Sequence, residues 1–143
     1  MATLYECDDA ARRKLDNYTG AATDVDLDGA IVALFVLPST AVSHSTALSA
    51  ITEATFPGYS RITLSGPWPA SAVTAHVAST TWGSTLTWTC TGGSPQTVYG
   101  LYVLDPSGTY LLYVANFDGG PYTMQNNGDQ IKVTLTETQQ SES

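Results

Sequence analysis

The sequence predicts an all-β protein, an antiparallel β-sandwich or jelly roll of about seven or eight short strands that follow a short N-terminal helix. Three observations lead to this prediction. The 143 residues include 21 Thr, eight Tyr and three Trp, and these residue types favour strands. After residue 30 the apolar residues alternate with polar ones with a period of two. Clusters of Gly, Pro, Asn and Asp separate the alternating segments.

A chain of this length can bury enough apolar surface to fold as one domain without disulfides or metal. We expect residues 1–29 to form an N-terminal arm with a short helix and an acidic turn. Residues 30–137 are expected to form the β-sandwich domain. Residues 138–143 are polar and are expected to be a disordered tail.

The helix is predicted over residues 8–19. Asp8 or Asp9 can cap its N-terminus, and Gly20 can close its C-terminus. The helix is short, so we expect its apolar stripe to pack on another part of the molecule. That stripe, with i, i+4, i+7 spacing, consists of Ala11, Leu15 and Tyr18.

The first strand is predicted over Ala30–Leu37, an apolar run typical of a buried strand. Residues 39–55 are rich in Ser, Thr and Ala, which indicates a long connection with one helical turn near 47–53. Residues 60–65 alternate again. The prolines of Pro67-Trp68-Pro69 lack a ladder donor and exclude this tripeptide from a central strand. A modest strand is expected over Val73–Val77.

The second half of the chain has the clearest strand patterns. Thr85–Cys90 alternates Leu, Trp and Cys with Thr. Residues 97–115 predict an antiparallel hairpin, because Asp105-Pro-Ser-Gly108 fits a type I turn. Residues 118–121 and 126–129 are further turns. The last strand is predicted over Gln130–Thr136, with its apolar side chains turned inward: Ile131, Val133 and Leu135.

The charge of the chain limits its partners. A net charge of −8 and a pI near 4.3 argue against nucleic-acid binding and against attraction to an anionic membrane. The apolar run of residues 30–37 is too short to cross a bilayer. The N-terminus shows no apolar signal region, so we expect synthesis in a cytoplasm without cleaved export.

One motif points to a metal. Asp24-Val-Asp26-Leu-Asp28-Gly29 matches the first half of a calcium loop, in which alternate carboxylates converge on the ion. The twelfth position is Phe35, where such a loop needs a bidentate glutamate. Asp24, Asp26 and Asp28 are therefore either a weak calcium site or an acidic, solvent-facing turn before the first strand.

The remaining residues give no sign of catalysis, and we expect neither an enzyme nor a cofactor. His44 and His76 lack spaced partners that would form a metal pair. Cys7 and Cys90 could form one disulfide, but nothing in the sequence requires it, and we expect two free thiols with Cys90 in the core. No G-x-S-x-G elbow and no phosphate-binding glycine loop occurs. The acidic loop of residues 24–29 is the one sequence feature that would support a calcium-assisted hydrolase.

The aromatic residues suggest contacts with other molecules. Four tyrosines lie in the predicted hairpin, at positions 99, 102, 110 and 113, and some of them must face away from the core. Exposed aromatic side chains such as Trp68 and Tyr110 suit a sugar or a protein interface. Ordinary cross-strand packing is the alternative. Charged residues make up only 13% of the chain, which favours a surface that docks without desolvating charge.

Three segments resemble a diffuse group of small virion proteins of tailed phages. They are Ile51–Leu64, which contains Gly58-Tyr-Ser-Arg61; Thr97–Asp105, which contains Tyr99-Gly-Leu-Tyr102; and Asn127–Leu135, which contains Gly128-Asp-Gln-Ile131. The resemblance covers about residues 8–136. It implies a β-sandwich virion component without an active site, described in the group either as a capsid decoration (cement) protein or as a tail-fibre-like protein.

The resemblance leads to two hypotheses. The first is a decoration protein that binds the major capsid protein of an assembled shell, as a homotrimer, and stabilises contacts between shell subunits. Its candidate anchor on the shell is the helical segment, with Arg12, Arg13, Lys14 and Tyr18 as interface candidates. The alternative is that this segment has no docking role and only covers one end of the sandwich. The second is a tail or fibre component that contacts a host sugar or protein through Trp68 and Tyr110.

Overall fold

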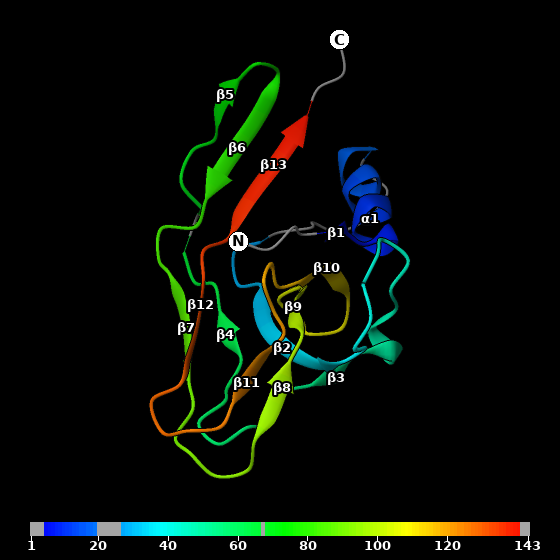
Figure 1. Ribbon diagram of the computed structural model, residues 1–143. Helices are drawn as coiled ribbons and strands as arrows, with labels where there is room; N and C mark the ends of the chain where they lie inside the picture. The colour runs from blue at the N-terminus through cyan, green and yellow to red at the C-terminus, as the bar shows by residue number, and fades with distance from the viewer. Residues whose placement is uncertain (1–4, 20–26, 67, 141–143) are drawn as a thin grey trace.

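The computed structural model describes residues 5–19, 27–66 and 68–140, and the predicted all-β class is confirmed (Figure 1). The predicted helix is also present. In chain order the elements are β1 (Tyr5–Glu6), α1 (Asp8–Thr19), β2 (Ile31–Leu37), the 3₁₀ turn η1 (Leu48–Ala50), β3 (Thr52–Glu53), β4 (Ile62–Thr63), β5 (Ala72–Thr74), β6 (Val77–Thr81), β7 (Leu86–Thr89), β8 (Gln96–Val98), β9 (Gly100–Leu104), β10 (Leu111–Asn116), β11 (Tyr122–Met124), β12 (Gln130–Val133) and β13 (Thr136–Gln140).

A six-stranded antiparallel sheet forms the centre of the molecule. Its strand order is β1-β10-β9-β2-β3, and β4 also pairs with β2. The predicted hairpin is confirmed as β9 and β10. Its turn closes with a 2.8 Å hydrogen bond from Gly108 N to Asp105 O. The Asp105 carboxylate also accepts the backbone N–H groups of Thr109 and Tyr110, at 2.9 and 2.8 Å. The turn residues and the Asp105 carboxylate therefore fix how β9 and β10 pair.

The two faces of this sheet bury separate apolar clusters, because successive side chains of a strand point to opposite faces. Val32 and Leu34 of β2 join the larger cluster, which also contains Trp88, Met124 and Ile131 from the strands that cover this face. On the opposite face the buried side chains are Ala33, Phe35, Tyr102, Leu104 and Val114. Val42, Leu48 and Ile51, which lie before, within and after η1, cover them.

Two strand pairs, β7–β12 and β8–β11, supply the covering strands. The predicted alternation is confirmed in both β7 and β12: Leu86, Trp88, Ile131 and Val133 are buried, whereas Thr87 and Lys132 are exposed. Cys90, directly after β7, is a fully buried free thiol, as expected. Within the described residues the strands are divided among four antiparallel sheets.

The fourth sheet, with the order β13-β6-β5, extends beyond the rest of the molecule (Figure 1). It corrects two predictions. The expected strand Val73–Val77 is interrupted by a two-residue turn at Ala75 and His76, which have φ angles of 48° and 67°. His76 is therefore a turn residue and not a sheet-face residue.

The second correction concerns the polar tail, which was expected to begin at residue 138. Thr138, Gln139 and Gln140 belong to β13 and pair with β6, because the ladder satisfies their backbone groups. The N-terminal arm is likewise joined to the body, since β1 pairs with β10.

A polar cluster attaches β3 and β4 to the centre of β2. The Tyr59 hydroxyl accepts a 3.1 Å hydrogen bond from Leu34 N and donates one of 2.8 Å to Glu53 Oε1. Arg61 binds both oxygens of Glu53 from Nε and NH2, at 2.8 and 2.7 Å. This bidentate pairing lowers the pKa of Glu53 below its usual value of 4.5. The Gly-Tyr-Ser-Arg segment thus has a structural role.

Candidate docking surface

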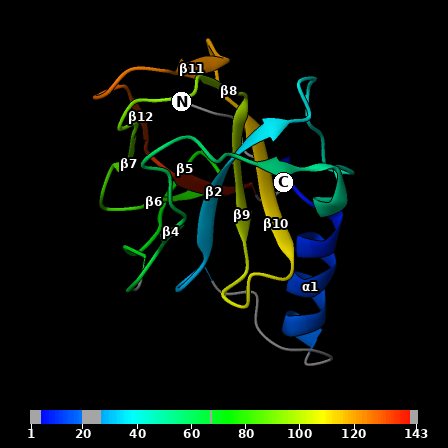
Figure 2. The same cartoon turned by 90° about the horizontal axis from the view of Figure 1, so that it is seen from below.

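Helix α1 lies at the β10 side of the central sheet (Figure 2). Its residues divide into an inner and an outer set. Ala10 is fully buried and belongs to the larger apolar cluster. Lys14, one turn later, is half-buried. Cys7, directly before the helix, is also buried, so one side of this short segment faces the body.

Lys14 contacts three strands from this inner side. Its Nζ donates a 2.8 Å hydrogen bond to the Tyr113 hydroxyl of β10. The same Nζ lies 3.3 Å from Glu6 Oε2 of β1 and 3.4 Å from Glu137 Oε1 of β13. It also lies 5.4 Å from the centroid of the Tyr113 ring. The side chain of Lys14 is therefore committed to contacts within the chain.

Tyr113 is the buried member of this cluster, at 4% exposure. Its hydroxyl donates a 2.8 Å hydrogen bond to Glu137 Oε1. Burial, together with the charge and the hydrogen bond of Glu137, raises the pKa of Tyr113 well above its usual value of 10.0. The phenol therefore stays neutral and links the cation to the carboxylate.

The outer side of α1 carries the apolar stripe that the sequence predicts. Ala11 and Arg12 are exposed, and Leu15 is 62% exposed. The expectation that this stripe packs on the molecule is wrong for Ala11 and Leu15, because Ala10 and Lys14 take the inner positions instead. An exposed leucine beside an exposed arginine gives this face of α1 the composition of an interface. We name Ala11, Arg12 and Leu15 the α1 face.

The other candidate interface residues are not brought together. The side chains of Arg13 and Tyr18 lie outside the described part. Trp68 is half-buried, packs against the larger cluster and contacts Trp82 with ring centroids 5.4 Å apart and ring planes tilted by 58°. Tyr110 is 39% exposed and lines a pocket of about 290 Å³ beside Cys7 and His44. Trp68 and Tyr110 therefore belong to separate parts of the surface.

The calcium candidate is described only in part. Asp24 and Asp26 lie outside the described residues. Asp28 is exposed, and its Oδ1 accepts a 2.9 Å hydrogen bond from Gly66 N. Among the residues that the structure describes, no three His, Cys, Asp or Glu side chains lie close enough to share a metal ion. Within the same residues no helix has the length and apolar character needed to span a membrane.

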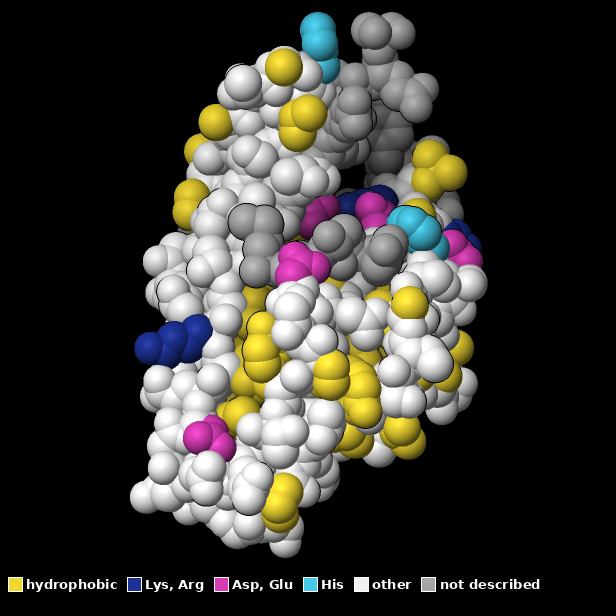
Figure 3. All heavy atoms as spheres, viewed as in Figure 1, with side chains coloured by type: hydrophobic (Ala, Val, Ile, Leu, Met, Phe, Trp, Pro, Cys, Tyr) yellow, Lys and Arg dark blue, Asp and Glu magenta, His cyan; other side chains and the backbone are white. Residues whose placement is uncertain are grey.

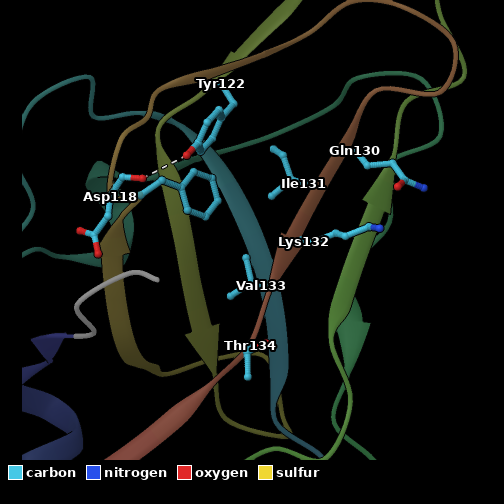
Figure 4. A pocket seen from close by; sticks show the side chains of 8 residues that line it. Asp118, Tyr122, Gln130, Ile131, Lys132, Val133 and Thr134 are labelled. Carbon is cyan, nitrogen blue, oxygen red and sulfur yellow. Dashed lines mark hydrogen bonds between the residues drawn. The ribbon is translucent and has the colours of Figure 1, made fainter.

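A groove of about 500 Å³ was not expected from the sequence. It lies between β12 and the turn that leads into β11. Ile131 and Val133 point toward the side of Asp118 and Tyr122, whereas Gln130 and Lys132 point away (Figure 4). Tyr122 is 42% exposed, and its hydroxyl donates a 3.0 Å hydrogen bond to Asp118 O. The only sequence signal was the turn at residues 118–121, which does not reveal which strand lies opposite.

Charge is unevenly distributed along the chain. Residues 62–104, which include β4 to β9, contain no Asp, Glu, Lys or Arg. On the face that Figure 3 shows, most charged side chains gather in one band, and large areas on both sides of it are uncharged. Most of this face can therefore contact another protein without desolvating a charge.

Comparison of the chain with models of protein families, with curated proteins and with solved structures found no significant match. The likeness to phage virion proteins therefore rests on the sequence motifs alone.

Proposed function

We propose that the chain is a structural protein of a phage virion, a decoration protein that binds the assembled shell and stabilises contacts between its subunits. The observation that carries the proposal is the outward position of the α1 face. A leucine exposed to 62% on a helix that is fixed to the body supplies a rigid apolar anchor. The stretch of residues 62–104 without charged side chains supports the same proposal, because a surface of this kind can stay buried in a permanent assembly without desolvating charges.

Such a protein acts by linkage. A protein that binds the assembled shell and not its separated subunits stabilises the shell by about 2.7 kcal/mol per site at a hundredfold excess over its Kd. The partner is then the major capsid protein. A homotrimer would match the local symmetry of a shell, and this oligomeric state is part of the proposal.

The first test is quantitative peptide mass spectrometry of purified virions of the phage that encodes the chain. A copy number that is a regular fraction of the major capsid protein supports a decoration protein. A handful of copies points to a tail or fibre component, and absence from the particle refutes both.

The second test locates the docking surface. Shells that lack the chain are mixed with purified protein and sedimented. Leu15→Glu and Arg12→Glu are expected to abolish cosedimentation. Val73→Glu is the matched control, since Val73 of β5 is 71% exposed and distant in sequence from α1. Loss of binding with Val73→Glu alone would move the docking surface to the β13-β6-β5 sheet.

The groove beside β12 favours a second candidate, a tail or fibre component that contacts a host sugar. Aromatic rings stack on the apolar faces of sugars, and Tyr122 offers an exposed ring whose centroid lies 5.6 Å from that of Phe117. Binding on a glycan array that Tyr122→Ala abolishes and Tyr110→Ala preserves would support this function over the first.

A further inference from the structure

Among the described side chains of helix α1, Ala10 is the one that is fully buried. The described inner residues of the helix are Ala10, a small side chain, and Lys14, whereas Leu15 points outward. A twelve-residue helix is marginal in water by its own propensity, so it needs tertiary contacts to persist. Backbone hydrogen bonds from Cys7 N to Leu112 O and from Asp8 N to His44 O attach the start of the helix, and among its described side chains Lys14 makes the polar contacts that join the next turn to the body.

Lys14 joins α1 to three strands at once. Its Nζ contacts one group from each of three strands: Glu6 from β1, Tyr113 from β10 and Glu137 from β13. The three ionic side chains are only partly exposed, at 39% for Lys14, 33% for Glu6 and 22% for Glu137.

Removal of the cation changes this cluster in a defined way. Glu6 and Glu137 would remain close to each other without a positive charge between them. The Tyr113 hydroxyl would keep its bond to Glu137 and lose its donor. Two half-buried carboxylates left without the cation between them repel each other, so the attachment of α1 is sensitive to this one side chain.

We propose that Lys14 is a latch that holds α1 on the β-sheet body, and that α1 opens as a unit of its own when the latch is broken. Local opening of this kind is expected where apolar contacts are few and polar contacts are partly exposed. Strand β1 stays paired with β10 through Tyr5 and Glu6, so the opening unit begins after β1.

The latch has a consequence for docking, and this step rests on the proposed function. A closed latch fixes the orientation of Arg12 and Leu15 before a partner arrives, which lowers the entropic cost of binding. An open latch leaves the α1 face without a fixed orientation. The latch therefore couples the state of α1 to the affinity of the docking surface.

Limited trypsin digestion of the purified chain tests the latch without a shell, so its result does not depend on the proposed function. Arg12 and Arg13 lie within α1, whereas Arg61 and Lys132 lie in the β-sheet body and report its opening. When opening is fast, the cleavage rate follows the population of the open form. Mass spectrometry distinguishes the products of the two regions.

The variant is Lys14→Met, which keeps the aliphatic stem and removes the charge. Cleavage after Arg12 and Arg13 is expected to rise about tenfold or more, while cleavage after Arg61 and the thermal midpoint stay close to those of the unchanged chain. Tyr113→Phe removes the bridging hydroxyl and should give a smaller rise. Lys132→Met is the matched control, because Lys132 is exposed on β12.

Two results would overturn the proposal. One is an unchanged rate at Arg12 and Arg13 in both variants. The other is a parallel rise at Arg61, because α1 would then open only with the whole fold. If Lys14→Met fails to fold, the cleavage rates of Tyr113→Phe are compared with those of the unchanged chain instead. Failure of Lys14→Met to fold would itself contradict a helix that opens separately from the body.

Discussion

Replacement of Tyr59 by Phe is the sharpest test of how the central sheet is held. The ring of Tyr59 packs against the larger apolar cluster, and its hydroxyl is the acceptor for Leu34 N in the fully buried part of β2. The same hydroxyl donates to Glu53. Phe keeps the ring and removes both hydrogen bonds.

The expected cost follows from these two bonds. A buried N–H left without an acceptor costs about 1–3 kcal/mol, and a hydrogen bond to a charged acceptor contributes about 1.5–3 kcal/mol. Because Arg61 still binds Glu53 through two atoms, the second loss is only partial. We therefore expect Tyr59→Phe to lower the free energy of unfolding by about 2–4 kcal/mol.

Urea unfolding measures this change. With a slope of about 2 kcal/mol per molar urea for a domain of this size, the midpoint should fall by about 1–2 M. Tyr122→Phe is the control, since its hydroxyl bonds Asp118 O at the surface and its loss should cost less than about 1 kcal/mol. Equal midpoints for the two variants would refute the argument that Tyr59 supplies a needed acceptor to β2.

Three further predictions follow from the fold. Gly100→Ala would place a methyl group against Ala115 O and 2.7 and 2.8 Å from ring atoms of Phe35, so we expect a loss of more than about 3 kcal/mol in thermal unfolding; a loss below 1 kcal/mol would contradict it. Replacing Ala75-His76 by Asn-Gly should raise stability by about 1 kcal/mol, because both positions have positive φ; an unchanged melting temperature would show that the turn is not strained. Since the pKa of Glu53 is lowered in the folded state, its contribution is complete above its usual value of 4.5 and disappears as the pH falls through the lowered value. The stability advantage over Glu53→Gln should therefore shrink below about pH 4.5, and a constant advantage down to pH 2 would argue against this pairing.

The sequence predicted those elements whose signals are local. The alternation in β7 and β12 follows from the two-residue period of a strand, and it identified the buried side chains of both. The hairpin of β9 and β10 could be predicted because its turn carries proline and glycine at the positions that a type I turn prefers. In both cases the residues that carry the signal belong to the strand or turn that they predict.

The β5–β6 hairpin could not be predicted in this way. Two-residue hairpin turns usually contain Asn or Gly, and Ala75 and His76 give no such signal. The pairing of β13 with β6 joins residues more than fifty positions apart, and the polar composition of residues 138–140 indicated a tail. Tertiary pairing decided both outcomes against the local signal.

The orientation of α1 shows why the candidate docking surface could not be predicted from the sequence. Helical spacing identifies which residues share a stripe, but not whether that stripe faces the body. Successive residues of a helix are turned by ~100°, so with Lys14 directed at the body Leu15 lies toward the outer side of the helix. The choice is made by groups that are 99 and 123 positions away from Lys14, namely Tyr113 and Glu137. A cation that finds these partners takes the inner position, and the exposure of Leu15 is the direct consequence.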